Sequence, residues 1–198
     1  MSLKGIRIGF AVSGSFCTFS KAFAQAEKLA EAGAELTPVM SFNAASLDTR
    51  FGRAADNIGR IEKICGRPAI KTLEAAEPIG PRRMFDIFVI APCTATTMGK
   101  LAHAIYDTPV TLGAKSHLRS ERPVLIALST NDALSASAAN IGALLRLRHY
   151  YFVPFYMDDP RSKPFSLTAD MELLPEAVQA ALEGVQLSPM IVQRQKTE

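Results

Sequence analysis

The sequence lacks several features that would assign it to a large class of proteins at once. No apolar run approaches the ~20 residues of a membrane-spanning helix, and residues 1–5 lack a secretory signal pattern. Cys17, Cys65 and Cys93 are odd in number and far apart, which excludes a disulfide framework or a zinc-binding spacing. The net charge of +3 is small and its basic residues are scattered. We therefore expect a cytoplasmic protein that binds neither membranes nor nucleic acids.

What is present indicates one α/β domain. The chain has 198 residues, of which 48% are hydrophobic, enough for a well-filled core. A strand, a helix ended by Gly33 and a second strand open the chain, as in a doubly wound parallel sheet. We predict a single doubly wound sheet of flavodoxin-like, Rossmann-like three-layer type over residues 1–184, with a C-terminal tail at 185–198. The expected strands are 6–12, 34–40, 85–91, 123–128 and 150–155. The expected helices are 18–32, 48–65, 98–104, 109–118, 133–147 and 173–182. Residues 157–168 are expected to form a loop or a partner-binding arm.

Small polar residues follow three of the predicted strands. They are Ser13-Gly14-Ser15, the stretch from Pro92 to Thr97, and Ser129-Thr130-Asn131. Pro92 cannot extend a ladder of hydrogen bonds, so we expect the chain to turn there and to deliver Cys93 and the following threonines to a helix start. Ligands bind at the carboxyl ends of parallel strands, and helix N-termini suit phosphate. The three clusters together predict a site for a phosphate and a ring, although one threonine alone is equally explained as a helix cap.

This pattern differs from a dinucleotide-binding fingerprint. The turn at Gly14 has no G-x-G-x-x-G, and Met40-Ser41 stand where an acidic residue would close the second strand. The chain is therefore not expected to hold a nicotinamide dinucleotide by itself, whereas a mononucleotide stays open.

The thiol and imidazole groups do not form a catalytic pair in the sequence. Cys93 opens a predicted helix, but His103 is about two turns away, so a small half-buried structural thiol is the favoured interpretation. His103 and His117 lie in helical segments with apolar neighbours, and His149 precedes two tyrosines; all three are expected to be packed or satisfied rather than catalytic.

Two charged groups allow two interpretations each. Asp158-Asp159, followed by Arg161 and Lys163, fits either a charged lid or docking arm or a solvated loop. The second group consists of Lys115, His117, Arg119 and Arg122. It fits either a binding site for a dicarboxylate or an exposed helical face.

The clusters, in this order, resemble the homo-oligomeric flavin-containing cysteine decarboxylase superfamily. Its Pro-Ala-Ser-Ala-Asn-Thr motif matches residues 92–97, and its Met-Asn pair matches Thr130-Asn131. The resemblance implies FMN as cofactor and a homo-oligomer based on trimers. It implies that Gly14, Ser15 and Thr94 approach the phosphate, with Ser41 and Asn43 on a second flank. The ribityl chain or ring is implied to lie near Thr97, Ser129, Thr130 and Asn131, and Pro92, Cys93 and Thr96 complete the motif.

Within this superfamily, residues 3–192 resemble the family of dipicolinate synthase B subunits. The shared stretches include Thr49-Arg50-Phe51-Gly52, Ser129–Leu134 and Asp158-Asp159-Pro160. This resemblance implies oxidation of dihydrodipicolinate to dipicolinate with NADP during sporulation, together with an A subunit that holds the nicotinamide. The alternatives are an FMN-binding assembly module without a catalytic residue of its own and a flavin-modifying transferase.

The sequence also departs from the superfamily pattern. The decarboxylases have a histidine between the second strand and the next helix, but residues 40–67 contain none. The asparagine of their motif is Thr96 here. Flavin prenyltransferases carry an Arg-Glu pair where this chain has Ser129-Thr130-Asn131. These departures argue against decarboxylase and prenyltransferase chemistry, and they leave no residue identified as catalytic.

Overall fold

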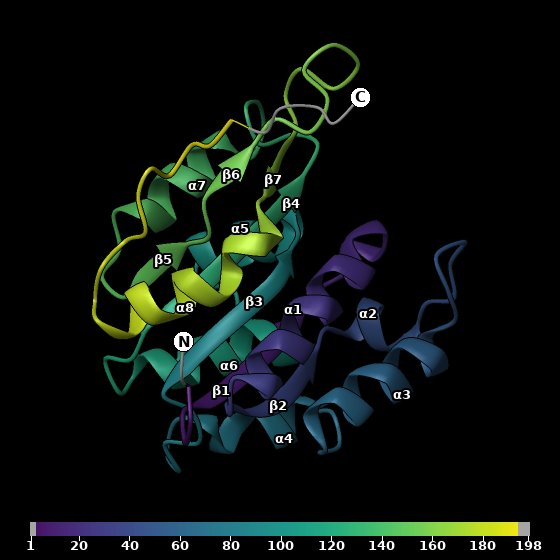
Figure 1. Ribbon diagram of the computed structural model, residues 1–198, viewed down its shortest axis with the longest axis vertical. Helices are drawn as coiled ribbons and strands as arrows, with labels where there is room; N and C mark the ends of the chain where they lie inside the picture. Colours follow the sequence, from purple (N-terminus) through teal and green to yellow (C-terminus); the bar gives the residue numbers. More distant parts are fainter. Residues whose placement is uncertain (1–2, 194–198) are drawn as a thin grey trace.

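A computed structural model describes residues 3–193 (Figure 1). Within them, seven strands form one sheet in the order β2-β1-β3-β4-β7-β6, with β5 paired to β4 beside this path. The sheet is parallel except where β7 pairs antiparallel with β4 and β6. The strands are β1 Arg7–Val12, β2 Glu35–Met40, β3 Ile87–Cys93, β4 Val124–Thr130, β5 Tyr150–Phe152, β6 Phe155–Tyr156 and β7 Leu167–Ala169.

Helices cover both faces of the sheet, as predicted for a flavodoxin-like three-layer fold (Figure 1). The α-helices are α1 Phe19–Glu31, α2 Phe42–Ser46, α3 Ala54–Cys65, α4 Leu73–Ala76, α5 Ala95–Ala102, α6 Pro109–Leu118, α7 Ala138–Leu145 and α8 Leu174–Leu182. Short 3-10 helices lie at η1 Phe16–Thr18, η2 Glu77–Ile79 and η3 Met171–Leu173.

Alternating strand residues explain the two helical layers. In β3, Ile87 and Val89 enter the cluster under α1 and α8, whereas Phe88 and Ile90 enter the cluster under α5 and α6. All four side chains are fully buried. A strand buried on both faces has to be apolar throughout, which is why these runs are recognisable in the sequence.

The predicted turn at Pro92 is wrong in its position. β3 continues through Pro92 to Cys93, and its register against β4 shifts between Ile90 and Cys93. Pro92 lies in this irregular stretch, where a residue without an N–H is tolerated. The helix that follows begins at Ala95 rather than near 98, because Thr94 caps it.

Other boundaries differ where polar side chains bind the backbone. The helix predicted from residue 48 begins at Ala54, whose N–H donates to the Asp48 carboxylate at 2.8 Å. The helix predicted from 133 begins at Ala138, after a turn in which the Ser137 hydroxyl donates to Asp132 at 3.0 Å. Such local bonds compete with helix formation.

The C-terminal third contains structure that the sequence pattern did not indicate. The predicted strand 150–155 is divided into β5 and β6 around Val153-Pro154, and the predicted loop 157–168 ends in β7, so β6 and β7 form a hairpin. In the predicted tail, the Gln186 side-chain amide makes two hydrogen bonds to the Phe152 backbone. It accepts from the Phe152 N–H at 2.8 Å and donates to the Phe152 carbonyl at 2.7 Å. Met1, Ser2 and residues 194–198, which belong to the predicted N-terminal segment and tail, lie outside the described residues.

Candidate functional site

Two adjoining cavities open at the carboxyl ends of the central strands. The larger has a volume of about 510 Å³ and the smaller about 270 Å³. Gly14, Thr94 and Thr96 line both, so they form the ridge between the cavities. Gly14 follows β1 and the two threonines follow β3, and these strands are neighbours in the sheet. The ridge therefore lies where ligands bind in open α/β sheets.

A buried serine fixes the two strand ends that carry the ridge. The Ser13 hydroxyl donates to the Pro92 carbonyl at 2.9 Å and accepts from the Thr94 N–H at 3.0 Å. Thr94 in turn accepts from the Thr97 N–H at 3.3 Å and caps α5. The capping interpretation of Thr94 is thus confirmed, and the capping residue lines both cavities as well. The N–H groups of Ala95 and Thr96, the first two residues of α5, have no partner within the helix, and both residues line the larger cavity.

The smaller cavity gathers the beginnings of three helices. Ser41 caps α2, accepting from the Ala44 N–H at 3.3 Å, and Thr108 caps α6, accepting from the Thr111 N–H at 3.2 Å. Lys100 also lines this cavity and donates to the Asp107 carboxylate at 2.7 Å. The helix beginnings make this cavity suited to an anion, whereas Lys100 is paired with Asp107, which lines the same cavity.

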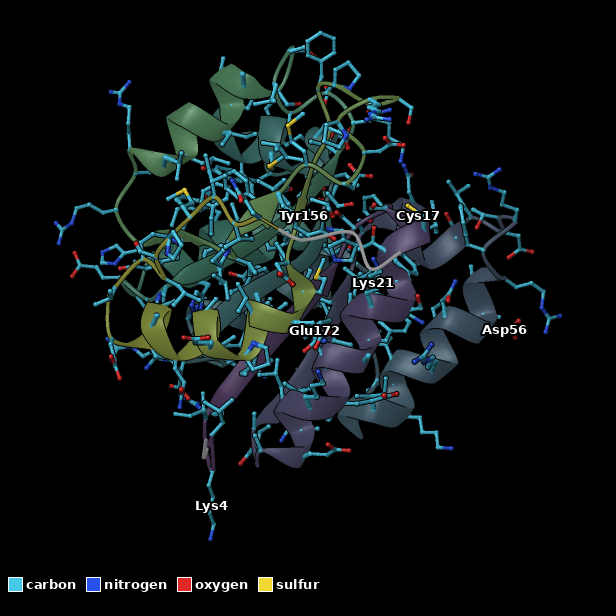
Figure 2. The ribbon with its side chains drawn as sticks, turned by 45° about the horizontal axis from the view of Figure 1, so that its top comes forward. Lys4, Cys17, Lys21, Asp56, Tyr156 and Glu172 are labelled. Atoms are coloured by element: carbon cyan, nitrogen blue, oxygen red, sulfur yellow. The ribbon has the colours of Figure 1, made fainter. Side chains whose placement is uncertain are left out.

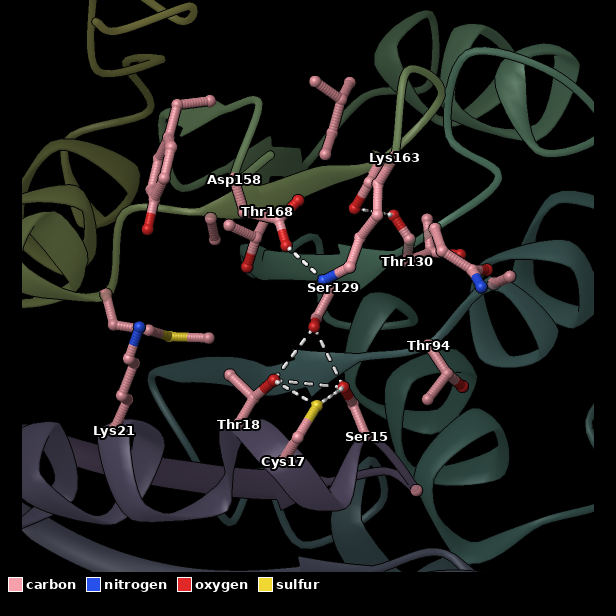
Figure 3. A pocket seen from close by; sticks show the side chains of 18 of the residues that line it. Ser15, Cys17, Thr18, Lys21, Thr94, Ser129, Thr130, Asp158, Lys163 and Thr168 are labelled. Atoms are coloured by element: carbon pink, nitrogen blue, oxygen red, sulfur yellow. Dashed lines mark hydrogen bonds and ion pairs between the residues drawn. The ribbon is translucent and has the colours of Figure 1, made fainter. Parts of the chain in front are cut away.

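The larger cavity lies between α1 and the β6–β7 hairpin (Figure 3). Its floor is a triangle of hydroxyl groups from Ser15, Thr18 and Ser129, with oxygen–oxygen distances of 2.9 to 3.1 Å. On the hairpin side, the Lys163 ammonium donates to the Asp158 carboxylate at 3.1 Å. Asp159 accepts from the Ser162 hydroxyl. Asp158 and Lys163 therefore line a cavity, whereas Asp159 stabilises its own turn.

Ten of the twelve residues that the sequence predicted as cofactor-binding line one of these cavities. Gly14, Thr94 and Thr96 line both; Ser15, Ser129, Thr130 and Asn131 line the larger; Ser41, Asn43 and Thr97 line the smaller. The strand-end argument therefore brought together residues separated by more than a hundred positions in the chain.

Pro92 and Cys93 are the two that line neither cavity. The register shift at Pro92 turns the Cys93 side chain into the core under α5 and α6, where it is fully buried. Burial raises the pKa of the Cys93 thiol far above its usual range. Cys93 is therefore held as a neutral thiol, which agrees with a structural role and argues against a nucleophile, but it is fully buried in β3 and not half-buried at the helix start.

Several lining residues were not predicted to bind the cofactor. Thr18 and Lys21 follow the Ser13-Gly14-Ser15 turn, and a helix beginning there placed them within reach of the same site. Lys163 and Thr168 come from the hairpin, whose pairing of Ser129 with Thr168 has no local sequence signal. Lys100 and Thr108 reach the smaller cavity from α5 and the start of α6.

The group formed by Lys115, His117, Arg119 and Arg122 does not form a dicarboxylate receptor. His117 is 2% exposed, and its Nε2 lies 3.1 Å from the Pro123 carbonyl. Arg122 pairs with Asp86 at 3.3 Å and donates to the Phe85 carbonyl. Neither side chain is available to a ligand, which confirms the prediction that His117 is satisfied rather than catalytic.

His117 is expected to make the protein less stable in mild acid. Burial, outweighing the bond to Pro123, lowers the pKa of His117 from 6.5 to about 4. Below pH 6.5 the unfolded chain takes up a proton that the folded chain refuses until about pH 4, so this contribution to stability is lost as the pH falls through that window. We expect a loss of about 2 kcal/mol between pH 7 and pH 5, measured by urea unfolding. His117→Gln should remove this contribution, and an unchanged pH dependence in the variant would contradict the assignment.

Two further observations concern residues 3–193. No group of three or more histidine, cysteine, aspartate or glutamate side chains there is arranged to hold a metal ion. No helix in this part of the chain is long and apolar enough to cross a membrane.

Comparison with known proteins agrees with the geometry. Residues 1–185 match the family described as Flavoprotein. The chain is 45% identical to the dipicolinate synthase B subunit of Bacillus subtilis (strain 168) over 192 residues, which are 97% of this chain and 96% of that protein.

Solved structures extend the comparison. The crystal structure of the dipicolinate synthase B subunit from Bacillus halodurans C superposes with a TM-score of 0.90 at 40% identity, covering 98% of this chain and 100% of that one. Burkholderia xenovorans DmrB in complex with FMN, described as a cubic protein cage for redox transfer, has a TM-score of 0.68 at 18% identity and covers 90% of this chain and 96% of its own. The latter likeness shows a shared fold.

Proposed function

This chain belongs to the Flavoprotein family, and from that premise we propose that it is the B subunit of a dipicolinate synthase. The enzyme would oxidise dihydrodipicolinate to dipicolinate with NADP during sporulation. The observation that carries the proposal is the likeness to the Bacillus B subunits along almost the whole length of both chains. Both cavities and the ridge between them lie within the matched region.

The proposal assigns NADP to a partner A subunit. The turn after β1 has a single glycine, Gly14, and β2 ends at Met40 without an acidic residue, so the groups that hold a dinucleotide are missing. A subunit with this sheet but without that fingerprint fits a division of labour between two chains. We propose a cytoplasmic location for the complex, because NADP is available there.

The residues around the ridge fit FMN. A phosphate on the Gly14 and Thr94 loops would meet the unpaired N–H groups of α5, with Ser41 and Asn43 on the second flank. Thr97, Ser129, Thr130 and Asn131 would lie near the ribityl chain or ring. FMN would supply hydride or single-electron transfer when bound. Several relatives with this fold are described as FMN-dependent or as FMN complexes, which supports the assignment.

We also propose that the chain forms a homo-oligomer built from trimers. Phe42, Leu47 and Phe51 are 44 to 50% exposed on the segment that carries Asn43. Three large apolar side chains within ten residues are the composition expected of a subunit interface beside the smaller cavity. Relatives described as a dodecamer and as a cubic cage show that this fold assembles.

FMN titration of the purified chain tests the flavin site. We expect micromolar binding of FMN, followed by quenching of flavin fluorescence, and no comparable binding of riboflavin, because the phosphate carries the contacts to the ridge. Gly14→Ala should weaken FMN binding by about tenfold or more, the loss expected when a charge-assisted hydrogen bond is obstructed. A Cβ at Gly14 would meet the nearest atoms of Phe16 and Asn43 at 3.5 to 3.8 Å, so the fold should tolerate it.

Gly142→Ala is the matched control for this titration, because a Cβ there meets nothing within 4 Å and Gly142 lines neither cavity. Equal binding of FMN and riboflavin, or no binding of either, would contradict a phosphate site at the ridge. In the second case the chain would keep the family fold without the cofactor.

A further inference from the structure

The hydroxyl triangle at the floor of the larger cavity joins three separate segments. Ser15 follows β1, Thr18 belongs to η1, and Ser129 lies in β4 (Figure 3). The Ser15 and Ser129 oxygens are 2.9 Å apart, and the Thr18 oxygen lies 3.1 Å from Ser15 and 3.0 Å from Ser129. Each hydroxyl has one hydrogen that rotates, so the triangle is able to turn donors towards a bound anion.

Two ammonium groups line the same cavity from different elements. Figure 3 shows Lys163 extending from the hairpin above Ser129 and Lys21 extending from α1 on the side of Thr18. Within residues 3–193, Lys21 has no ion pair or hydrogen bond, and its side chain is exposed. Lys163 pairs with Asp158 at 3.1 Å and keeps two of its three N–H donors for other acceptors.

The acidic groups at the cavity do not cancel Lys21. Glu172 also lines the cavity, and Figure 2 shows it near Lys21 across the face of α1. Its carboxylate accepts from Lys28 at 2.6 Å and from Gln25 at 3.2 Å. The Glu172 carboxylate is paired with Lys28 and the Asp158 carboxylate with Lys163, so neither neutralises the positive charge of Lys21. This positive charge favours an anionic ligand.

The remaining wall is apolar. Leu167, Ala169 and Met171 line it together with the ring of Tyr156. A volume of about 510 Å³ lies in the range of small-molecule sites. The cavity therefore combines cations and hydroxyl donors with a surface suited to a flat, uncharged ring.

We propose that the larger cavity is the substrate-binding site of this subunit and takes a planar cyclic dicarboxylate. One carboxylate accepts from Lys21 and the Thr18 hydroxyl, the other accepts from Lys163, and the ring lies against Met171 and Leu167. Ser15 and Ser129 then border the flavin site. A carboxylate offers only acceptors, which matches the ammonium and hydroxyl donors of this cavity, whose own carboxylates, Asp158 and Glu172, are each paired with a lysine. This inference rests on the proposed function, since it names the part of this chain that would receive that enzyme's substrate.

Calorimetric titration of the full chain, saturated with FMN, with pyridine-2,6-dicarboxylate tests this site. Lys21→Gln should weaken dicarboxylate binding by about tenfold, the loss expected for one charge-assisted hydrogen bond, and leave FMN affinity unchanged. Pyridine-2-carboxylate, with one carboxylate, should bind less tightly than the dicarboxylate. Lys63→Gln is the matched control, because Lys63 is an exposed lysine of α3 that lines neither cavity.

Three results would overturn the proposal: no binding to the wild-type chain, equal binding to wild type and Lys21→Gln, or a loss of FMN affinity in Lys21→Gln that matches the loss of dicarboxylate affinity. The last would assign Lys21 to the flavin phosphate. Turnover by the complex of both subunits separates this inference from the proposed function. Turnover without an effect of Lys21→Gln on dicarboxylate binding removes the inference alone, whereas Lys21-dependent binding without turnover removes the function alone.

Discussion

The isolated chain is expected to oxidise no dihydrodipicolinate when it is mixed with NADP, and the activity is expected to appear when the proposed A subunit is added. The turn at Gly14 lacks the dinucleotide fingerprint. Within residues 3–193 no histidine lines either cavity, and the buried Cys93 is a neutral thiol. The measurement is the rise in absorbance of reduced nicotinamide with each subunit alone and with both together. Turnover by this chain alone would contradict the proposed division of labour.

Within that complex, Asn131→Ala distinguishes a chemical role of this subunit from a role in assembly. Asn131 is exposed at the larger cavity, so its removal should leave the fold intact. We expect turnover to fall by about tenfold through loss of a hydrogen bond to substrate or flavin, with no change in the mass of the complex. Asn140→Ala, on α7 outside both cavities, serves as the control. Unchanged turnover in Asn131→Ala would favour the assembly module.

Replacement of Gly80 by alanine is expected to cause a much larger loss of stability than the same replacement at Gly14 or Gly142. A Cβ at Gly80 would clash with the Ser116 carbonyl oxygen, a backbone atom of α6 that has no freedom to rotate away. The Gly80 N–H also donates to the Ser116 hydroxyl at 2.9 Å, and that hydroxyl donates to the Glu77 carbonyl at 2.9 Å. We expect a loss of about 3 kcal/mol or more in the free energy of unfolding, measured in urea.

Gly59→Ala is the matched control for this experiment. Gly59 lies inside α3, and a Cβ there meets nothing within 4 Å. Alanine in a helix interior is favoured over glycine by about 0.5–1 kcal/mol, so this variant should be more stable than wild type. A Gly80→Ala protein as stable as Gly59→Ala would show that η2 moves away from α6 without cost.

The sequence predicted the parts of the fold that depend on local pattern. The apolar run of β3 and the small polar residues at the ends of β1, β3 and β4 were recognisable because a strand buried on both faces has to be apolar and its end has to turn. The parallel arrangement then required those ends to meet, which is why Gly14, Thr94 and Ser129 were predicted at one site. Membership of the Flavoprotein family and likeness to the B subunits also follow from the residues alone.

The tertiary structure decided what lines the site besides these strand ends. The register shift at Pro92 turned Cys93 into the core, since a local irregularity in a strand reverses which face each later side chain occupies. The β6–β7 hairpin brought Lys163 above Ser129, and no residue near Lys163 in the sequence indicates that pairing, because the contacts between β4 and β7 join positions more than thirty residues apart. Sequence determined the sheet and its binding edge; long-range strand pairing decided which charges face the cavity.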